Sequence, residues 1–323
     1  GLRAAGVEVG VSALLYDLIR GGAESLKRHA DEVNDLNVFP IPDGDTGSNM
    51  LMTIEGAVGL APKDHENVGA YARRAADAML LAARGNSGVI LSQIADGFAA
   101  GLDGAEATNA EWFADAFRKG TEHAYAAVAE PVEGTILTVV REASDYAGER
   151  SHTDVTEYLH DFLSKARETL RKTPELLPIL KKSGVVDSGG AGLIYIVEGM
   201  AAVSGGDALP EYEEHHTVPS GADLDLDLFD EDSELTFGYC TELLLRLQNA
   251  KTDITHFDVE TIKGYLQTVG DSIVCFQTGS IVKLHVHTKE PYKVLAFCQK
   301  YGEYLTVKIE NMSLQHKIGR AHV

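Results

Sequence analysis

The apolar residues of the first two thirds of the chain recur with the period of an α-helix. From about Val9 to Gly205 they lie three and four positions apart, and short glycine-rich or polar loops separate the segments. No part of this region alternates with period two, so we expect it to be all-α. The expected helices cover residues 11–33, 48–58, 65–83, 87–99, 110–129, 135–146, 155–172 and 190–203.

Eight consecutive helices with short loops predict an up-and-down barrel or bundle in which sequential neighbours run antiparallel. In that topology every second loop lies at the same end. Loops 1–2, 3–4, 5–6 and 7–8 are therefore expected to lie together. A proline-broken turn is expected after the seventh helix.

The pattern changes after residue 235. A strand at 236–247, a helix at 259–269, strands at 272–277 and 280–288, a helix at 292–301 and a strand at 304–309 give the order βαββαβ of a ferredoxin-like domain. We therefore expect a helical domain at 1–206, an acidic linker at 207–234, an α+β middle domain at 235–312 and a tail at 313–323. The linker is rich in Asp and Glu and contains no Lys or Arg, which is typical of a solvated spacer.

Composition narrows the classes of partner and compartment. The net charge of −21 argues against nucleic acid as a partner, because little basic charge is available to neutralise phosphates. No apolar run is long enough for a membrane span, and the first residues have no signal-peptide pattern. Three cysteines without a disulfide spacing suggest a reducing cytoplasm. The chain does not begin with Met, which we interpret as a processed or recombinant start.

The four loops expected at one end of the bundle share a composition. Residues 37–49, 84–88, 130–135 and 186–192 each place Gly with Ser, Thr, Asn or Asp where a helix begins. Free backbone N–H groups and the helix dipole attract phosphate there, and glycine allows close approach. A single such loop could be an ordinary N-cap. Four at one end predict a composite phosphate site.

Asp43 and Asp45 add a second property to the first of these loops. Two carboxylates one residue apart suit a hard cation such as Mg²⁺, which bridges nucleotide phosphates. Thr46, Ser48 and Asn49 follow with hydroxyl and amide groups. There is no GxxxxGK[ST] sequence, so this is not a Walker loop, and the absence of a lysine makes a metal more necessary.

The motifs LNVFPIPDGDTGSNM, ARGNSGVILSQ, EPVEGTILTV and VVDSGGAGL together resemble the nucleotide-binding domain of the bacterial fatty-acid kinase catalytic subunit. That domain is similar to the ADP-binding subunit of dihydroxyacetone kinase. The segments LTFGYCTE and VKLHVHT resemble the middle domain of the same family. The resemblance implies an eight-helix barrel that holds Mg-nucleotide at one end. It implies Asp43 and Asp45 as catalytic Mg²⁺ ligands, with Asn37 or Asp35 nearby as a third.

The same resemblance implies the residues that bind ATP or ADP. Asp187 and Gly189 would lie nearer the ribose or base. The remaining set is Asn37, Thr46, Gly47, Ser48, Asn49, Asn86, Ser87, Gly88, Gly134 and Thr135.

The family transfers a phosphoryl group to a fatty acid that a separate fatty-acid-binding protein presents, and an acyl phosphate results. A carboxylate acceptor is already ionised at pH 7, so the reaction needs no general base. His29 and His123 are accordingly expected to be surface or packing residues. The alternatives are phosphoryl transfer to a small hydroxyketone, as in dihydroxyacetone kinase, and a non-catalytic nucleotide-binding scaffold. By resemblance we also expect a homodimer and a further C-terminal domain beyond this chain.

A second site is expected in the middle domain. His285 and His287 alternate along one strand and therefore point to the same face. Cys240 lies on the first strand, which neighbours the third in a ferredoxin-like sheet. These residues suit Zn²⁺, with water or Glu242 in the fourth position. The alternative is an exposed pair of histidines and an unrelated cysteine. The resemblance supports zinc and implies a role in dimerisation or partner docking.

Overall fold

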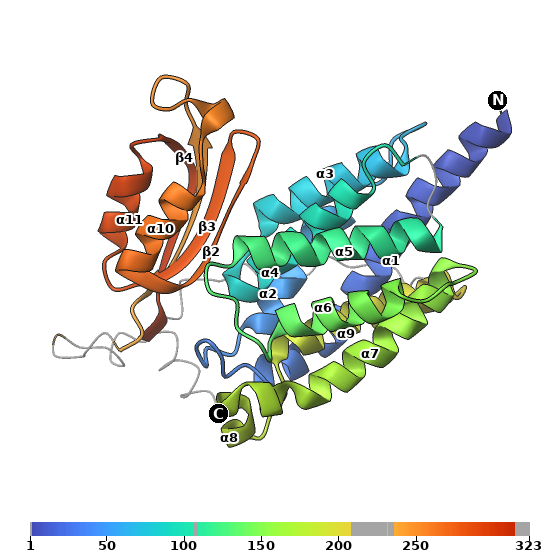
Figure 1. Ribbon diagram of the computed structural model, residues 1–323, viewed down its shortest axis with the longest axis horizontal. Helices are drawn as coiled ribbons and strands as arrows, with labels where there is room; N and C mark the ends of the chain where they lie inside the picture. The colour runs from blue at the N-terminus through green and yellow to red at the C-terminus, as the bar shows by residue number, and fades with distance from the viewer. Residues whose placement is uncertain (1, 106–108, 208–230, 232–235, 314–323) are drawn as a thin grey trace. The chain divides into compact units, whose positions relative to one another are not determined.

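The computed structural model describes residues 2–105, 109–207, 231 and 236–313 of the chain. Two compact units divide it (Figure 1). The helical unit comprises residues 1–39, 44–125 and 131–214. The sheet unit comprises residues 40–43, 126–130 and 215–323. The predicted linker lies almost entirely outside the described residues, and so does the tail beyond residue 313.

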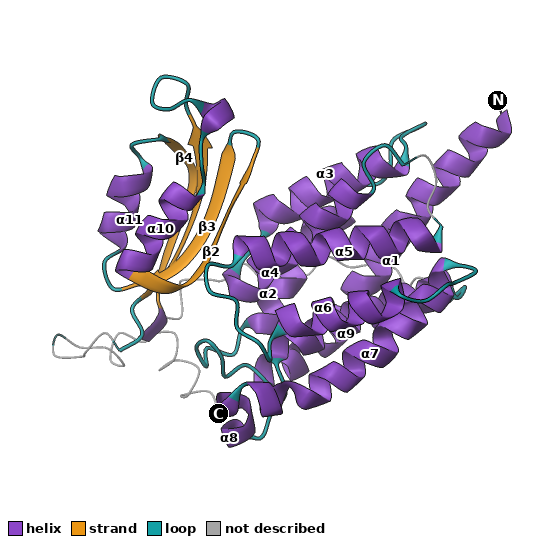
Figure 2. Ribbon diagram, viewed as in Figure 1, coloured by secondary structure: helices purple, strands orange, loops and turns teal. Residues whose placement is uncertain are grey.

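Every helix expected from the periodicity is present in the helical unit (Figure 2). In order they are α1 (Leu2–Asp35), α2 (Thr46–Val58), α3 (Val68–Ala82), α4 (Gly85–Gly101), α5 (Ala110–Ala127), α6 (Ile136–Gly148), α7 (Val155–Leu176) and α9 (Ser188–Ser204), with the short α8 (Pro178–Ser183) before α9. α1 packs along α2 and α9, α3 packs along α4, and α6 packs along α7. Of the helices in the described residues, none is both long and apolar enough to cross a membrane.

The end of α7 differs from the prediction, which stopped that helix at residue 172. α7 continues through Pro174 to Leu176. Pro174 lacks the N–H that would reach the carbonyl of Leu170, but the Thr173 hydroxyl donates to that carbonyl instead, at 2.7 Å. The predicted break after it is also wrong, because Pro178 occupies the first position of α8, where a missing N–H costs nothing.

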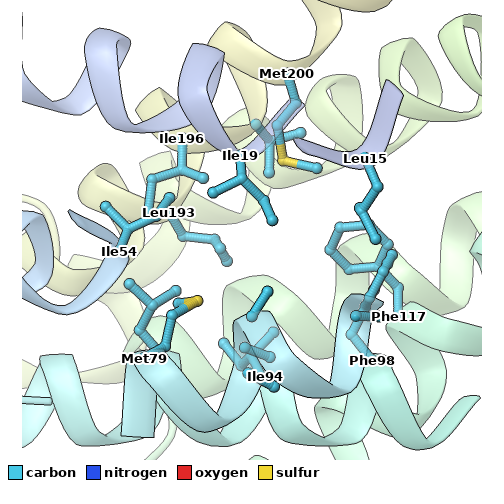
Figure 3. Close-up of a pocket in the computed structure, with 16 residues that line it drawn as sticks. Leu15, Ile19, Ile54, Met79, Ile94, Phe98, Phe117, Leu193, Ile196 and Met200 are labelled. Atoms are coloured by element: carbon cyan, nitrogen blue, oxygen red, sulfur yellow. The ribbon is translucent and has the colours of Figure 1, made fainter. Parts of the chain in front are cut away.

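The interior of the helical unit is apolar and aromatic. The largest fully buried side chains include Tyr71, Phe113, Tyr158 and Phe162. Beside the aromatic cluster lies an apolar cavity of about 100 Å³ (Figure 3). Side chains from α1, α2, α3, α4, α5 and α9 line it, and Met79 and Met200 are among them. The cavity is a packing defect between helices that are otherwise closely apposed.

The sheet unit contains β1 (Tyr239–Leu247), α10 (Glu260–Val269), β2 (Gly270–Thr278), β3 (Ile281–Thr288), α11 (Pro291–Cys298) and β4 (Gly302–Asn311). This is the βαββαβ order of elements that the sequence predicts. The strands are arranged in the order β2-β3-β1-β4, and each neighbouring pair is antiparallel. β1 begins three residues later than predicted, and a 3₁₀ turn at Ile254–His256 was not predicted.

One face of the sheet packs on α10 and α11. Leu243, Leu245 and Leu247 of β1 lie on this face with alternate residues of β3, as the period-two pattern predicts. Cys275 and Cys298 are fully buried in the same core, where they act as small apolar residues. The opposite face of β1 and β3 therefore carries the polar residues of the predicted zinc site.

Candidate functional site

The four glycine-rich loops of the helical unit meet in space. The Ser188 hydroxyl, at the start of α9, donates to the Thr46 hydroxyl, at the start of α2, over 3.2 Å. A Cβ atom on Gly189 would lie 3.1 Å from Oγ of Ser87 on α4. The backbone N–H of Ile136, at the start of α6, donates to the Asp187 carboxylate. The first turns of α2, α4, α6 and α9 thus surround one region.

Two asparagines near the end of α1 hold the first turn of α2. Asn37 Oδ1 accepts the backbone N–H groups of Asp45, at 3.1 Å, and Thr46, at 3.3 Å. Asn34 Oδ1 accepts the N–H of Ser48 at 3.1 Å, and its Nδ2 donates to the Ser48 hydroxyl. An amide oxygen that accepts two N–H groups has both lone pairs engaged. In this structure Asn37 therefore shapes the loop as a cap, which is a different role from the predicted Mg²⁺ ligand.

The two predicted carboxylate ligands lie at the end of that loop. Asp45 is the N-cap residue of α2, yet in the described part of the chain its side chain makes no capping hydrogen bond. Its carboxylate is half-buried and is not consumed by the helix. Asp43 is also half-buried, and its N–H donates to the carbonyl of Ile41. Asp43 clusters with the sheet unit and Asp45 with the helical unit.

Other predicted nucleotide-binding residues have packing roles that explain their type. A Cβ on Gly47 would collide with the carbonyl of Ala30, so α2 can lie against α1 only with glycine there. Gly88 is equally close to Thr53 and Asn49. Asn49 is buried, whereas Asn86 in the first turn of α4 is half-buried. These contacts bring the starts of α2 and α4 together.

The loop before α6 is fixed at Gly134 and Thr135. Gly134 has a φ of +87°, and a Cβ there would meet Leu177. Thr135 Oγ1 donates to the carbonyl of Val132 at 2.7 Å and accepts the N–H of Leu137 at 3.4 Å as the N-cap of α6. The other N–H groups in the first turn of a helix have no acceptor within that helix, which leaves them to bind other groups.

Asp187 joins two of the loops. Its carboxylate accepts the N–H of Gly190 at 2.8 Å as the N-cap of α9, and also the N–H of Ile136. Its own N–H donates to Oγ1 of Thr173 at 3.1 Å. Burial raises the pKa of Asp187 to about 6, although the two N–H groups oppose that shift. The structure therefore uses Asp187 as a staple between α6 and α9.

The contributions of Asn34, Thr173 and Ser188 were not predicted. Each supplies its hydrogen bond from an element distant in sequence, so local pattern gives no direct signal. The two histidines expected to have packing roles are both engaged. His29 stacks on Tyr195, and Nδ1 of His123 lies 2.8 Å from the Asp96 carboxylate.

The sheet unit brings the predicted zinc ligands together. The ligand atoms of Cys240, His285 and His287 all lie within 4.8 Å of one another, and both histidines are buried. Cys240 Sγ lies 3.8 Å from Nδ1 of His285, and the Nε2 atoms of the two histidines are 3.1 Å apart. Ligand atoms of a tetrahedral Zn²⁺ are separated by roughly 3.3 to 3.6 Å, given its bond lengths. Small side-chain movements would satisfy that geometry.

The protonation states in this cluster also suit a metal. Nδ1 of His287 is buried and has no hydrogen-bonding partner among the described residues. Burial, aided by the proximity of His285, lowers the pKa of His287 to about 3, so its imidazole is neutral. Burial opposes ionisation of Glu242, but His285 at 3.1 Å and the nearby Lys308 hold the pKa of that carboxyl at about 2. Glu242 is therefore an anionic neighbour of the cluster.

Comparison with known proteins covers most of the chain. Residues 40–202 match the DAK2 domain family, and residues 236–318 match the FakA-like fatty acid kinase middle domain. An uncharacterised protein of Staphylococcus saprophyticus is 39% identical over 312 residues, which is 94% of this chain and 55% of that protein. Protein YloV of Bacillus subtilis is 39% identical over 315 residues, with 93% and 55% covered. The chain thus spans about half the length of these relatives.

A solved structure of dihydroxyacetone kinase from C. freundii, in complex with AMP-PNP and Mg²⁺, covers 59% of this chain and 34% of its own. Its TM-score is 0.45 at 16% identity, which is too distant to support an inference about function. The two family matches suffice, since they account for the helical and the sheet region in turn. The chain belongs to the DAK2 domain family and carries the middle domain of FakA-like fatty acid kinases.

Proposed function

We propose that the protein is the nucleotide-binding subunit of an ATP- and Mg²⁺-dependent fatty-acid kinase. It transfers the γ-phosphate of ATP to the carboxylate of a fatty acid that a separate fatty-acid-binding protein presents. The observation that carries this proposal is the convergence of the starts of α2, α4, α6 and α9 beside the carboxylate loop. The FakA-like middle domain supports the choice of acceptor. In this proposal the helical unit is an eight-helix barrel and the sheet unit is ferredoxin-like.

The chain's own groups account for phosphate binding without a lysine. Each helix start presents backbone N–H groups that its helix cannot satisfy, and the helix dipoles reinforce them. The hydroxyls of Thr46, Ser87 and Ser188 lie among these starts. Such a cradle binds the phosphate oxygens by directed N–H and O–H donors, and it needs a cation for the remaining charge.

Asp43 and Asp45 fit that cation by the chemistry of their donors. Carboxylate oxygens are the ligands that Mg²⁺ takes from proteins. Bound Mg²⁺ would supply the positive charge that draws phosphate oxygens together. The protein's own part is to place the Asp45 carboxylate, and it does so through the hydrogen bond from Asp45 N–H to Asn37.

The acceptor requires little of the site beyond orientation. A fatty-acid carboxylate is ionised at neutral pH, so no residue has to remove a proton. His123 is held by Asp96 and His29 by Tyr195, which agrees with a site that uses no histidine base. Catalysis then rests on positioning and charge neutralisation.

The test incubates the protein with Mg-ATP, a fatty acid and the fatty-acid-binding partner. Hydroxylamine traps any acyl phosphate, and ADP release is followed in parallel. Acyl phosphate that depends on the partner is the expected result. Phosphorylation of dihydroxyacetone in its place would favour the small-ketone alternative. Nucleotide binding without turnover, in a protein extended to the length of its relatives, would favour a scaffold.

We further propose that the sheet unit binds Zn²⁺ through Cys240, His285 and His287. The support is the buried, neutral donor set and the unpaired Nδ1 of His287 among the described residues. Metal analysis of purified protein should find about one zinc per chain. Cys240→Ser and His285→Ala should lose it, whereas the matched control Cys298→Ser, in the core on the other face, should retain it. Unchanged zinc in the first two variants would rule the site out.

A further inference from the structure

Glu133 stands immediately before Gly134 in the loop that leads into α6. Its carboxylate accepts three side-chain hydrogen bonds. The donors are the Tyr125 hydroxyl at 3.1 Å, the Thr138 hydroxyl at 2.5 Å and Nη2 of Arg141 at 3.0 Å. Tyr125 belongs to α5, and the other two belong to α6. An exposed carboxylate can be hydrated fully by water, so this set of donors marks a side chain held in one position.

The connection continues from Glu133 to the backbone. The Thr138 hydroxyl has a single hydrogen, which it gives to Glu133, so its lone pairs are left to accept. One of them accepts the backbone N–H of Gly134 at 2.8 Å. Glu133 thereby orients the Thr138 hydroxyl as an acceptor, and Thr138 fixes the Gly134 peptide. Thr138 is completely buried, so water cannot replace it in this role.

A negative charge beside a phosphate site would normally weaken anion binding. Here Arg141 forms an ion pair with the Glu133 carboxylate, and its guanidinium lies 5.7 Å over the Tyr125 ring. The pair is close to neutral as a unit. Glu133 can therefore hold the loop without adding repulsion between the protein and the phosphates.

We propose that Glu133 is a positioning residue of the phosphate site. Acting through the Thr138 hydroxyl, it holds the Gly134 peptide and the first turn of α6 in the orientation that binds phosphate. The inference rests on the proposed function, because it assigns to α6 one wall of the nucleotide site.

The test measures Mg-ADP affinity by calorimetry in wild type, Glu133→Ala, Thr138→Val and the double variant. Each single change should weaken binding about tenfold, the equivalent of one charge-assisted hydrogen bond. The double variant should be no weaker than either single variant, because both changes break the same link. Glu133→Gln keeps an oxygen that can accept from Thr138 and should retain most of the affinity. Glu130→Ala, an exposed carboxylate three residues earlier, is the matched control.

A second measurement needs no ligand. Exchange of the Gly134 amide hydrogen, followed by NMR, should be faster in Glu133→Ala than in wild type and unchanged in Glu130→Ala. Equal protection in Glu133→Ala, equal Mg-ADP affinity, or a double variant about a hundredfold weaker than wild type would each overturn the inference. Wild-type protein that binds no Mg-ADP would overturn the proposed function and this inference together. Wild-type binding with an unaffected Glu133→Ala would overturn the inference alone.

Discussion

Replacement of Asn37 by alanine separates two roles for this side chain. As a cap, Asn37 Oδ1 accepts the N–H groups of Asp45 and Thr46 and is 6% exposed. Removal leaves both groups without that acceptor at the start of α2. A net 0.5–1.5 kcal/mol for each hydrogen bond gives a loss of about 1–3 kcal/mol, in line with roughly 0.5–2 kcal/mol for N-cap replacements. We expect Asn37→Ala to lower the free energy of unfolding by about 2 kcal/mol with no metal or nucleotide present.

Urea denaturation of ligand-free protein in EDTA, followed by circular dichroism, measures this quantity. Asn37→Asp keeps an acceptor oxygen in the same place and should remain within about 1 kcal/mol of wild type. A pure metal ligand would behave differently, because its removal leaves the ligand-free protein as stable as before and weakens only Mg²⁺ binding. Wild-type stability of Asn37→Ala together with lost Mg²⁺ affinity would refute the capping role.

Three further predictions concern the interior of the helical unit. The Tyr158 hydroxyl is buried without a hydrogen-bonding partner among the described residues, so Tyr158→Phe should raise the free energy of unfolding by about 1 kcal/mol; a loss of that size in urea denaturation would show that the hydroxyl is satisfied. Ala75→Val, which adds two methyl groups, should stabilise by about 1 kcal/mol if it fills the 100 Å³ cavity, at about 24 cal/mol per Å³, and a lower thermal midpoint would show that the space cannot accept them. Asp187 has a folded pKa of about 6 against an ordinary value of 3.8, so the folded state binds more protons between these values and its stability falls as pH rises through that window. The stability of Asp187→Asn relative to wild type should therefore increase by up to about 3 kcal/mol from pH 4 to pH 7, and a difference that does not change with pH would contradict the raised pKa.

Local pattern was sufficient for the elements and for the meeting of the loops. Helical periodicity located each long helix, and antiparallel succession alone placed the starts of α2, α4, α6 and α9 together. Period-two alternation put His285 and His287 on one face, and the order of strands put Cys240 beside them. These features depend on neighbours in sequence or on topology, which the sequence specifies directly.

The remainder depended on contacts between distant residues. The continuation of α7 past Pro174 needed the Thr173 hydroxyl to replace a missing N–H donor, which proline statistics do not anticipate. The capping role of Asn37 and the three donors around Glu133 arise only when α1 meets α2 and α5 meets α6. A residue type compatible with a ligand is equally compatible with a cap, and tertiary structure decides between them.

The central claim is that the carboxylate loop binds Mg-nucleotide, and calorimetric titration with Mg-ADP tests it most directly. Wild-type protein should bind in the presence of Mg²⁺ and bind at least about tenfold more weakly in EDTA, because the cation supplies charge that the loops lack. Asp43→Ala and Asp45→Ala should each lose at least about tenfold in affinity. Asp31→Ala, an exposed carboxylate on α1, should not. Equal affinity of wild type, Asp43→Ala and Asp45→Ala would contradict the account.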